Sequence, residues 1–174
     1  MQDVYQRARA IRLAIFDVDG VLTDGRLYYS ERGEELKVFD VRDGHGLKML
    51  QESGVRLALI TSRESRAVAL RAANLGIDLV YQGVGEKLAV FEALIAQLKL
   101  DRSATAYMGD DLIDLPVLRR CGLALSVPEA PTAVRERAHY VTSACAGRGA
   151  AREASELIMR AQGSFDASIA AYLK

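Results

Sequence analysis

The sequence predicts an α/β fold with a doubly wound, mainly parallel β-sheet and a β-hairpin inserted after the first strand. From Ile11 onward, short apolar runs of strand length alternate with longer helix-patterned stretches, which is typical of successive βα units. Gly54, Gly76 and Gly122 follow helical stretches, at positions where helix ends favour glycine. These observations place the chain in the Rossmann-like class of α/β folds.

The length of the chain predicts one domain. With 174 residues it can bury one sizeable core and is short for two. We therefore expect a single domain over residues 1–174, with a core of about 11–162 and a C-terminal tail at 163–174.

Six apolar runs are predicted to be the strands of the sheet. Strands of a parallel sheet are covered by helices on both faces, so they read as continuous apolar segments. The predicted strands are residues 12–16, 55–60, 79–81, 104–108 and 123–127, with a weaker one at 140–141. The predicted helices between and after them are residues 45–52, 64–74, 86–99, 112–120, 132–138 and 150–162.

One segment interrupts the alternation of strands and helices. Residues 26–30 and 35–39 are strand-like and flank a turn that contains Gly33, which predicts a β-hairpin. A hairpin on a small domain exposes strand edges, and a partner subunit is a common cover for such edges. We therefore expect a homo-oligomer built partly through residues 27–39.

Composition excludes several classes of partner. Lys and Arg together number 23, as do Asp and Glu, so no net charge attracts nucleic acid or an anionic membrane. No apolar run approaches the roughly 20 residues of a membrane span, and residues 1–10 have no apolar core, so we expect a cytoplasmic protein. Cys121 and Cys145 lack a CxxC spacing and are expected to be reduced thiols.

The first acidic cluster follows the first predicted strand directly. Asp17, Asp19 and Asp24 lie within eight positions. Open α/β sheets bind ligands at the carboxyl ends of their strands, and carboxylates crowded there repel one another unless a cation compensates them. The pattern favours a divalent metal, although Asp19-Gly20 is also a common turn sequence.

A second acidic cluster repeats this arrangement after the strand at 104–108. Gly109 is followed by Asp110, Asp111 and Asp114 at the start of a predicted helix. Two acidic strand ends that meet at one sheet edge can supply oxygen ligands to Mg²⁺, and we predict Asp17 and Asp110 as those ligands. Asp111 has the alternative role of capping the helix.

Two further polar residues lie between the acidic clusters. Thr61 ends the strand at 55–60, where it can bind a ligand or form a turn, and Lys87 lies near a helix start, where it can bind an anion or remain solvated. In the order Asp17-x-Asp19, Thr61, Lys87 and Gly109-Asp110-Asp111-x-x-Asp114, these elements resemble the four motifs of the haloacid dehalogenase superfamily.

Within that superfamily the chain resembles the capless bacterial 3-deoxy-D-manno-octulosonate 8-phosphate phosphatases. The resemblance extends from Ile11 to Gln162 and is carried by residues 16–24, 40–44, 60–63, 81–87, 109–116 and 147–150. It implies a domain without a cap and a phosphomonoesterase that forms an aspartyl-phosphate, releases the free sugar acid for lipopolysaccharide precursor synthesis, and assembles as a homotetramer through the hairpin.

The resemblance also implies roles for the motif residues. Asp17 is the expected nucleophile, and Asp19 is the expected general acid and base. Asp17, the backbone carbonyl of Asp19, and Asp110 are expected to hold Mg²⁺, while Thr61 and Lys87 bind the phosphoryl oxygens. Asp111 and Asp114 are expected to support the metal or Lys87.

Substrate contacts are expected from a wider set of residues. Lys48, Arg63 and Arg71 are basic candidates for a carboxylate or the outer phosphate oxygens, although each can also be a solvated helix charge. His45 can contact a sugar hydroxyl or be structural, and Arg148 precedes a C-terminal segment that in the family closes over a neighbouring subunit's site. The substrate-binding residues that the resemblance implies are Asp19, Asp40, Arg42, Asp43, Gly44, Lys48, Arg63, Arg71 and Lys87.

Alternative functions differ in substrate or in chemistry. A phosphatase for a nine-carbon, sialic-acid-type 9-phosphate has similar motifs. A phosphomutase is disfavoured because it needs a cap domain, for which the chain has no room. A signalling receiver domain places its phosphoacceptor on a later strand than its acidic pair, opposite to the order here. A catalytically inactive interaction module remains the other non-enzymatic alternative.

Overall fold

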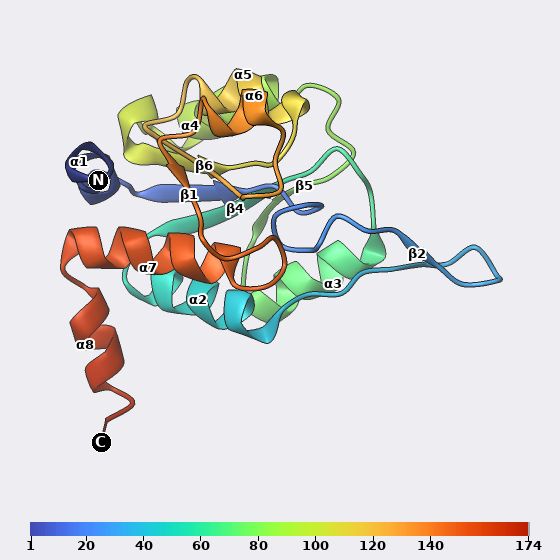
Figure 1. Cartoon of the computed structure of the whole chain (residues 1–174), viewed down its shortest axis with the longest axis horizontal. Coiled ribbons are helices and arrows are strands. Elements are labelled where there is room, and N and C mark those ends of the chain that lie inside the picture. The colour runs from blue at the N-terminus through green and yellow to red at the C-terminus, as the bar shows by residue number, and fades with distance from the viewer. Residues whose placement is uncertain (174) are drawn as a thin grey trace.

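A six-stranded parallel sheet forms the centre of the computed structural model, which describes residues 1–173 (Figure 1). The strand order is β5-β4-β1-β6-β7-β8. The strands are β1 (Leu13–Phe16), β4 (Arg56–Ile60), β5 (Leu79–Tyr81), β6 (Thr105–Met108), β7 (Leu123–Ser126) and β8 (Tyr140–Val141). The predicted α/β class is therefore confirmed, and each predicted strand of the sheet is present with ends that differ by at most one residue.

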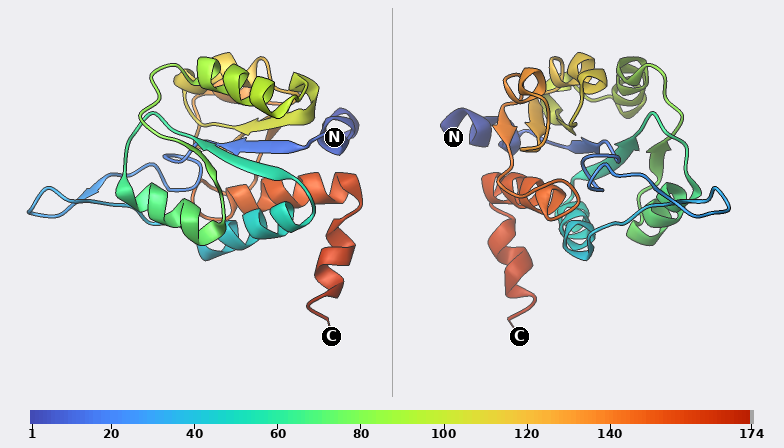
Figure 2. Two further views of the ribbon diagram at one scale, coloured as in Figure 1. Left: turned by 180° about the vertical axis from the view of Figure 1, so that it is seen from behind. Right: turned by 45° about the vertical axis from the view of Figure 1, so that its right-hand side comes forward.

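Helices cover both faces of this sheet (Figures 1 and 2). One layer contains α2 (Val41–Glu52), α3 (Arg66–Leu75) and α7 (Ala150–Gln162). The opposite layer contains α4 (Lys87–Leu98), α5 (Leu115–Leu118) and α6 (Thr132–Arg135). No helix within residues 1–173 is long and apolar enough to cross a membrane.

Three neighbouring strands position the residues of the candidate site. Phe16, at the end of β1, pairs in register with Leu59 of β4 and with Met108 of β6. All residues of β1 and β6 are buried, and burial of each large apolar side chain contributes about 1.5–3 kcal/mol. The loops that leave the three carboxyl ends therefore start from fixed points at one edge of the sheet.

The inserted hairpin has shorter strands than the sequence predicts. It consists of β2 (Tyr28–Tyr29) and β3 (Glu35–Leu36), in place of strands at 26–30 and 35–39. It extends away from the main sheet (Figures 1 and 2), and most of its side chains are exposed, so little packing supports a longer ladder. Gly33 adopts a positive φ of 77° at its turn, a conformation that glycine tolerates.

The helical segments differ from the prediction at four places, besides shifts of up to four residues at helix ends. The segment predicted as one helix at 112–120 is divided into a short 3₁₀ turn, η2 (Leu112–Asp114), and α5, where Pro116 lies in the first turn. Another 3₁₀ turn, η1 (Arg102–Ala104), precedes β6. Two short helices, α1 (Gln2–Arg9) and α8 (Phe165–Ala170), have no counterpart in the prediction.

The two unpredicted helices attach to the end of the molecule where the strands begin. Val4 and Ala8, one turn apart on α1, are buried, and α1 packs beside α7. Helix α8 extends from the end of α7, with Phe165 buried at its start (Figure 1). Both cysteines are free thiols, with Cys121 buried and Cys145 exposed.

Candidate active site

A cleft lies at the carboxyl edge of the sheet, where the sequence predicts ligand-binding residues. Asp17 follows β1 directly and Thr61 follows β4, while Asp110 is separated from β6 by one glycine. The cleft has a volume of about 230 Å³. Its lining residues are Asp17, Asp19, Gly25, Thr61, Ser62, Arg63, Asp110, Asp111 and Ile113. The topology thus brings residues from three strand ends into one concave site.

Two glycines allow the acidic loops to approach one another closely. A Cβ atom at Gly20 would lie 2.0 Å from Asp110 Oδ2, and φ at Gly20 is +85°. A Cβ atom at Gly109 would lie 2.4 Å from Asp114 Cγ. Gly20 belongs to a turn in which the Val21 N–H donates to the Val18 carbonyl. The turn expected at Asp19-Gly20 is therefore present and is itself part of the acidic site. Only glycine fits at these contacts without displacing a carboxylate.

Three carboxylates converge at the base of the cleft. Asp17, Asp110 and Asp114 each offer one oxygen atom within 4.8 Å of the others. Burial and the charge of Asp114 raise the pKa of Asp17 to about 6, although Lys87 opposes this effect. Burial and the charge of Asp17 raise the pKa of Asp110 to about 7. Both shifts show that ionised carboxylates are poorly compensated here.

The donor atoms fit a hard divalent cation. Asp110 Oδ1 is buried and has no hydrogen-bond partner in the described chain. Each oxygen of Asp114 already accepts two hydrogen bonds. Oδ1 accepts from Lys87 and Tyr107, and Oδ2 accepts from the N–H groups of Asp110 and Asp111. Oxygen ligands from one or two carboxylates suit Mg²⁺. Asp17 and Asp110 are therefore the carboxylates with capacity for the ion.

Lys87 is the buried cation of the site. Its ammonium lies 2.6 Å from Asp17 Oδ2 and 2.7 Å from Asp114 Oδ1, and its side chain is 1% exposed. Burial alone lowers the pKa of a lysine, but here the charges of Asp17 and Asp114 raise it above the usual value. The alternative of a solvated surface lysine is therefore wrong for Lys87.

Asp114 connects Lys87 to Tyr107 of β6. It is fully buried, and besides Lys87 it accepts a 2.6 Å hydrogen bond from the Tyr107 hydroxyl. Asp111 is exposed and its side chain accepts from the Leu112 N–H at 2.7 Å, so Asp111 caps η2 as the alternative interpretation proposes. Tyr107 was not among the predicted site residues. The sequence contained one signal for its role: Tyr107 lies in a strand predicted to be buried, and a buried tyrosine hydroxyl needs a hydrogen-bond partner nearby.

Two residues of the cleft lining, Asp19 and Arg63, contact the segment where the hairpin returns to the domain. The ammonium of Lys37 pairs with Asp19 Oδ1 and, at 2.9 Å, with Glu35 Oε1. Arg63 also pairs with Glu35, and it lies 3.3 Å from the Tyr29 hydroxyl. Asp19 and Arg63 were among the predicted site residues, whereas Lys37 and Glu35 were not, because their positions depend on the folding of the hairpin.

Thr61 is buried beside this network. Its hydroxyl oxygen accepts from the Arg63 N–H at 3.3 Å, which is the geometry of a turn residue. Thr61 also lines the cleft. Its predicted contact with a phosphoryl oxygen is compatible with this place.

Several predicted substrate-binding residues lie outside the cleft lining. Asp43 accepts from the N–H groups of Gly149 at 3.1 Å and Arg152 at 2.8 Å, at the start of α7. Gly44 faces Arg71, because a Cβ atom there would lie 2.1 Å from the Arg71 guanidinium. Their contact with substrate stays a prediction.

The remaining predicted substrate contacts are engaged elsewhere or exposed. Arg71 donates to the Asp40 carbonyl at 3.1 Å, and Arg42 pairs with the Asp40 carboxylate. Arg42 also donates to the Arg148 carbonyl, and Lys48 is exposed on α2. His45 packs edge-on against Tyr172 with ring centroids 5.5 Å apart, which favours its structural alternative.

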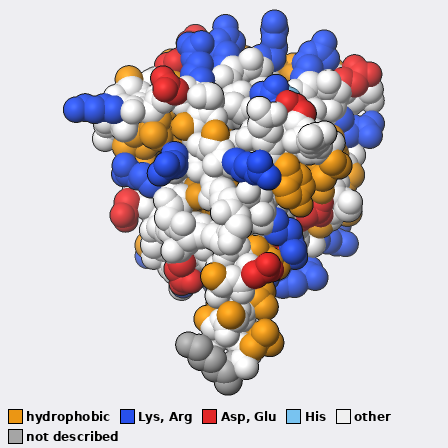
Figure 3. Space-filling model, turned by 90° about the vertical axis from the view of Figure 1, so that its left-hand side faces the viewer, with side chains coloured by type: hydrophobic (Ala, Val, Ile, Leu, Met, Phe, Trp, Pro, Cys, Tyr) orange, Lys and Arg blue, Asp and Glu red, His pale blue; other side chains and the backbone are white. Residues whose placement is uncertain are grey.

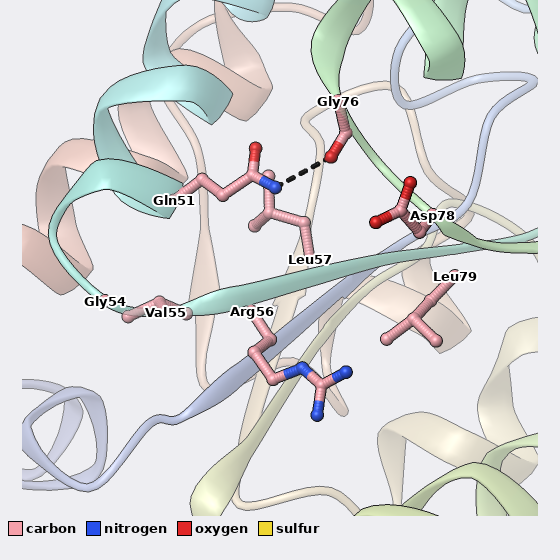
Figure 4. A pocket seen from close by; sticks show the side chains of 8 residues that line it. All are labelled: Gln51, Gly54, Val55, Arg56, Leu57, Gly76, Asp78 and Leu79. Carbon is pink, nitrogen blue, oxygen red and sulfur yellow. Dashed lines mark hydrogen bonds between the residues drawn. The ribbon is translucent and has the colours of Figure 1, made fainter.

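The opposite edge of the sheet has a different character. A cavity of about 160 Å³ lies near the start of β4, where Gln51 donates a 2.8 Å hydrogen bond to the Gly76 carbonyl (Figure 4). Asp78 is the one acidic residue among those that line this cavity. The face seen from this end carries scattered Lys and Arg side chains (Figure 3). The crowded carboxylates are therefore a property of the carboxyl edge.

Comparison with known proteins gives consistent matches. The family model described as haloacid dehalogenase-like hydrolase matches residues 26–122. The 3-deoxy-D-manno-octulosonate 8-phosphate phosphatase KdsC of Yersinia pestis is 48% identical over 92% of this chain and 86% of its own length. The protein of the same name from Escherichia coli (strain K12) is 46% identical over 94% of this chain and 87% of its own length.

Solved structures are similar over the full chain. A probable yrbi family phosphatase from Pseudomonas syringae has a TM-score of 0.99 and 52% identity, covering 100% of this chain and 99% of that one. The 3-deoxy-D-manno-octulosonate 8-phosphate phosphatase from Moraxella catarrhalis, in complex with magnesium, phosphate and KDO, has a TM-score of 0.97 and 44% identity, covering 99% of both chains.

Proposed function

Because the chain belongs to the haloacid dehalogenase-like hydrolase family, we propose that it is a Mg²⁺-dependent phosphatase of 3-deoxy-D-manno-octulosonate 8-phosphate. The observation that carries this proposal is the convergence of Asp17, Asp110 and Lys87 at one sheet edge. The substrate is supported by the 44% identical phosphatase whose structure contains magnesium, phosphate and KDO. The products are the free sugar acid, a lipopolysaccharide precursor, and phosphate.

Asp17 would act as the nucleophile. One of its carboxylate oxygens attacks phosphorus, and the bond from phosphorus to the ester oxygen breaks, with the electron pair leaving on that oxygen. The N–H of Val18 donates to Asp17 Oδ1 at 2.7 Å, and Lys87 donates to Oδ2. These two hydrogen bonds hold the carboxylate in one orientation, so that it reacts from a fixed position.

Asp19 would transfer the protons. It lies two residues after the nucleophile and lines the same cleft. As an acid it gives a proton to the leaving oxygen, and as a base it then takes one from the water that attacks the aspartyl-phosphate. Proton gain and loss balance over one turnover, and Asp17 is regenerated.

Mg²⁺ would be held by the carboxylates of Asp17 and Asp110 and by the backbone carbonyl of Asp19. When bound, it offsets the repulsion between a dianionic phosphate and an anionic nucleophile. Thr61 and Lys87 would donate hydrogen bonds to the phosphoryl oxygens, whose charge must be held while the attacking and leaving oxygens align.

The open cleft favours transfer to water. Only the small hairpin lies between β1 and α2, and within residues 1–173 no second domain covers the carboxyl edge of the sheet (Figures 1 and 2). Water therefore reaches the aspartyl-phosphate, and hydrolysis is the expected outcome in place of transfer to another sugar.

The decisive experiment is steady-state kinetics with a panel of phosphate esters. It compares the eight-carbon sugar acid 8-phosphate with a nine-carbon acidic sugar 9-phosphate, glucose 6-phosphate and p-nitrophenyl phosphate, each with Mg²⁺ and with chelator. We expect kcat/KM for the eight-carbon substrate to exceed the others by about 100-fold. Chelator and Asp17→Asn should each abolish turnover.

A matched control is Asp78→Asn, because Asp78 is exposed at the opposite edge of the sheet. This variant should retain wild-type kinetics. Equal kcat/KM for all four esters would refute the proposed preference for the eight-carbon sugar acid phosphate. Undiminished hydrolysis by Asp17→Asn would refute the mechanism.

We also propose that the chain acts as a single domain in a cytoplasmic homotetramer that associates through the hairpin. Exposed apolar side chains on and beside the hairpin support this assembly, and they are Leu27, Tyr28, Tyr29, Leu36 and Val38. Light scattering at micromolar concentration should give four times the chain mass. A monomer at that concentration would exclude the proposal.

A further inference from the structure

Lys37 is a buried cation that the mechanism above does not use. It directly follows β3, and its side chain is 2% exposed although the hairpin beside it is largely exposed. Its ammonium pairs with Asp19 on one side and with Glu35 on the other. A lysine is rarely buried unless it is paired, so this placement needs the two carboxylates.

The contact with Lys37 makes the two oxygens of Asp19 different. Oδ1 accepts a hydrogen bond from the ammonium. Oδ2 is buried and has no partner within residues 1–173. An ammonium has only donors, and protonation of the oxygen that accepts from it would weaken that charge-assisted bond, so the other oxygen is the favoured site for a proton. Any proton that the Asp19 carboxyl carries is therefore directed to Oδ2.

We propose that Lys37 is a positioning residue that fixes Asp19 so that Oδ2 transfers the protons of both chemical steps. The inference rests on the proposed phosphatase function and adds a residue to it. In the first step the proton moves from Oδ2 to the leaving oxygen as the phosphorus–oxygen bond breaks. In the second, Oδ2 takes a proton from the attacking water as the bond between Asp17 and phosphorus breaks.

A second ion pair holds Lys37 in place. Glu35 forms ion pairs with Lys37 and with Arg63, and Arg63 belongs to the loop that follows β4. This series of contacts ties the base of the hairpin to the edge of the main sheet. The hairpin thereby contributes to the chemistry of its own subunit through Lys37.

Leaving-group dependence tests the proposal. General-acid catalysis accelerates departure of a basic alkoxide strongly and of an acidic phenol little. We therefore measure kcat/KM, which reports the first chemical step, for the sugar acid phosphate, phenyl phosphate and p-nitrophenyl phosphate. Lys37→Met should lower kcat/KM by about 100-fold for the sugar phosphate and by less than about threefold for p-nitrophenyl phosphate.

Three further variants complete the experiment. Lys37→Arg retains a donor for both carboxylates and should recover most of the activity on the sugar phosphate. Lys99→Met changes an exposed lysine at the far end of α4 and should match wild type on all three esters. The double variant Lys37→Met with Asp19→Asn should be no slower than Asp19→Asn alone, because the lysine acts through the aspartate.

The possible outcomes separate this inference from the proposed function. If the wild-type enzyme hydrolyses none of the esters, the proposed function fails. If it is active but Lys37→Met lowers kcat/KM equally for all three esters, or changes none of them, the positioning role is overturned. An additive loss in the double variant would overturn it as well. Thermal unfolding of each variant identifies any loss that comes from misfolding, and Lys37→Arg then supplies the deciding comparison.

Discussion

Two lysines in this protein lie between pairs of carboxylates, and their surroundings differ. Lys87 pairs with Asp17 and Asp114, and Lys37 pairs with Asp19 and Glu35. Burial alone lowers the pKa of each ammonium, yet the neighbouring carboxylates raise both pKa values above the usual range. Each lysine is therefore a charged ammonium held between two carboxylates.

The difference lies in the carboxylates and in the elements that carry them. The side chains of Asp17 and Asp114 are 6% and 0% exposed, on loops that leave two central strands. Those of Asp19 and Glu35 are 18% and 17% exposed, and Glu35 belongs to a strand of two residues. Ions without solvent contact depend on one another for stability, whereas partly exposed ions can be rehydrated. We call Lys87 with its acidic neighbours the core cluster, and Lys37 with Asp19, Glu35 and Arg63 the hairpin network. Loss of the core cluster should therefore destabilise the fold, whereas loss of the hairpin network should mainly displace Asp19.

The pKa shifts of the acidic partners run in opposite directions. Burial, with the charge of Asp114, raises the pKa of Asp17, and burial with the charge of Asp17 raises that of Asp110. The hydrogen bonds from Lys37 and Arg63 lower the pKa of Glu35. The core cluster therefore lacks positive charge, which a divalent cation supplies, while the hairpin network is already balanced.

Replacement of each lysine by methionine should give the largest contrast. Lys87→Met leaves two buried carboxylates without a cation, which costs about 3–5 kcal/mol of unfolding free energy. At about 2–4 °C per kcal/mol for a chain of this size, the melting temperature should fall by about 6–20 °C. Lys37→Met should cost at most about 1 kcal/mol, because its partners regain water.

Thermal unfolding in metal-free buffer at neutral pH measures this contrast. Lys99→Met is the matched control, because Lys99 is exposed. Equal losses of stability for Lys87→Met and Lys37→Met would show that the hairpin network supports the fold as much as the core cluster does. That result would remove the distinction between the two networks.

The same distinction explains how much the sequence could predict. Asp17, Thr61, Asp110 and Lys87 were identifiable because each lies near a strand end or helix start, and the parallel topology brings such positions to one edge. Most strands and helices followed from apolar runs. The site residues anchored on the main sheet were therefore accessible from local patterns.

Residues whose partners are set by tertiary structure were not accessible. Lys37 and Glu35 read as ordinary charges of a hairpin until the hairpin folds back on Asp19. The sequence also did not show that the Asp43 carboxylate accepts from two N–H groups at the start of α7, more than a hundred residues later in the chain, while its contact with substrate stays a prediction. Short helices such as α1 form only because Val4 and Ala8 pack on the domain, and their sequences are too short to predict helix alone.

The pH dependence of stability should distinguish the two networks by a smaller effect. The pKa values of Asp17 and Asp110 rise from 3.8 to about 6 and about 7 in the folded protein. Their contribution to stability is therefore present at low pH and is lost as the pH rises through about 6–7. The pKa of Glu35 is lowered, so its contribution is complete above its ordinary value of 4.5 and is lost only as the pH falls further.

Mg²⁺ requires ionised carboxylates, so the increase in melting temperature that it produces should grow between about pH 5 and pH 8. Melting temperatures with Mg²⁺ and with chelator across this range measure the effect. Asp110→Asn should abolish most of the Mg²⁺ response, because it removes one carboxylate ligand and one of the two raised pKa values. Glu35→Gln should leave the pH dependence of that response unchanged, since Glu35 is ionised throughout the range. A Mg²⁺ response that is independent of pH in the wild type would contradict the assignment of the uncompensated charge to the core cluster.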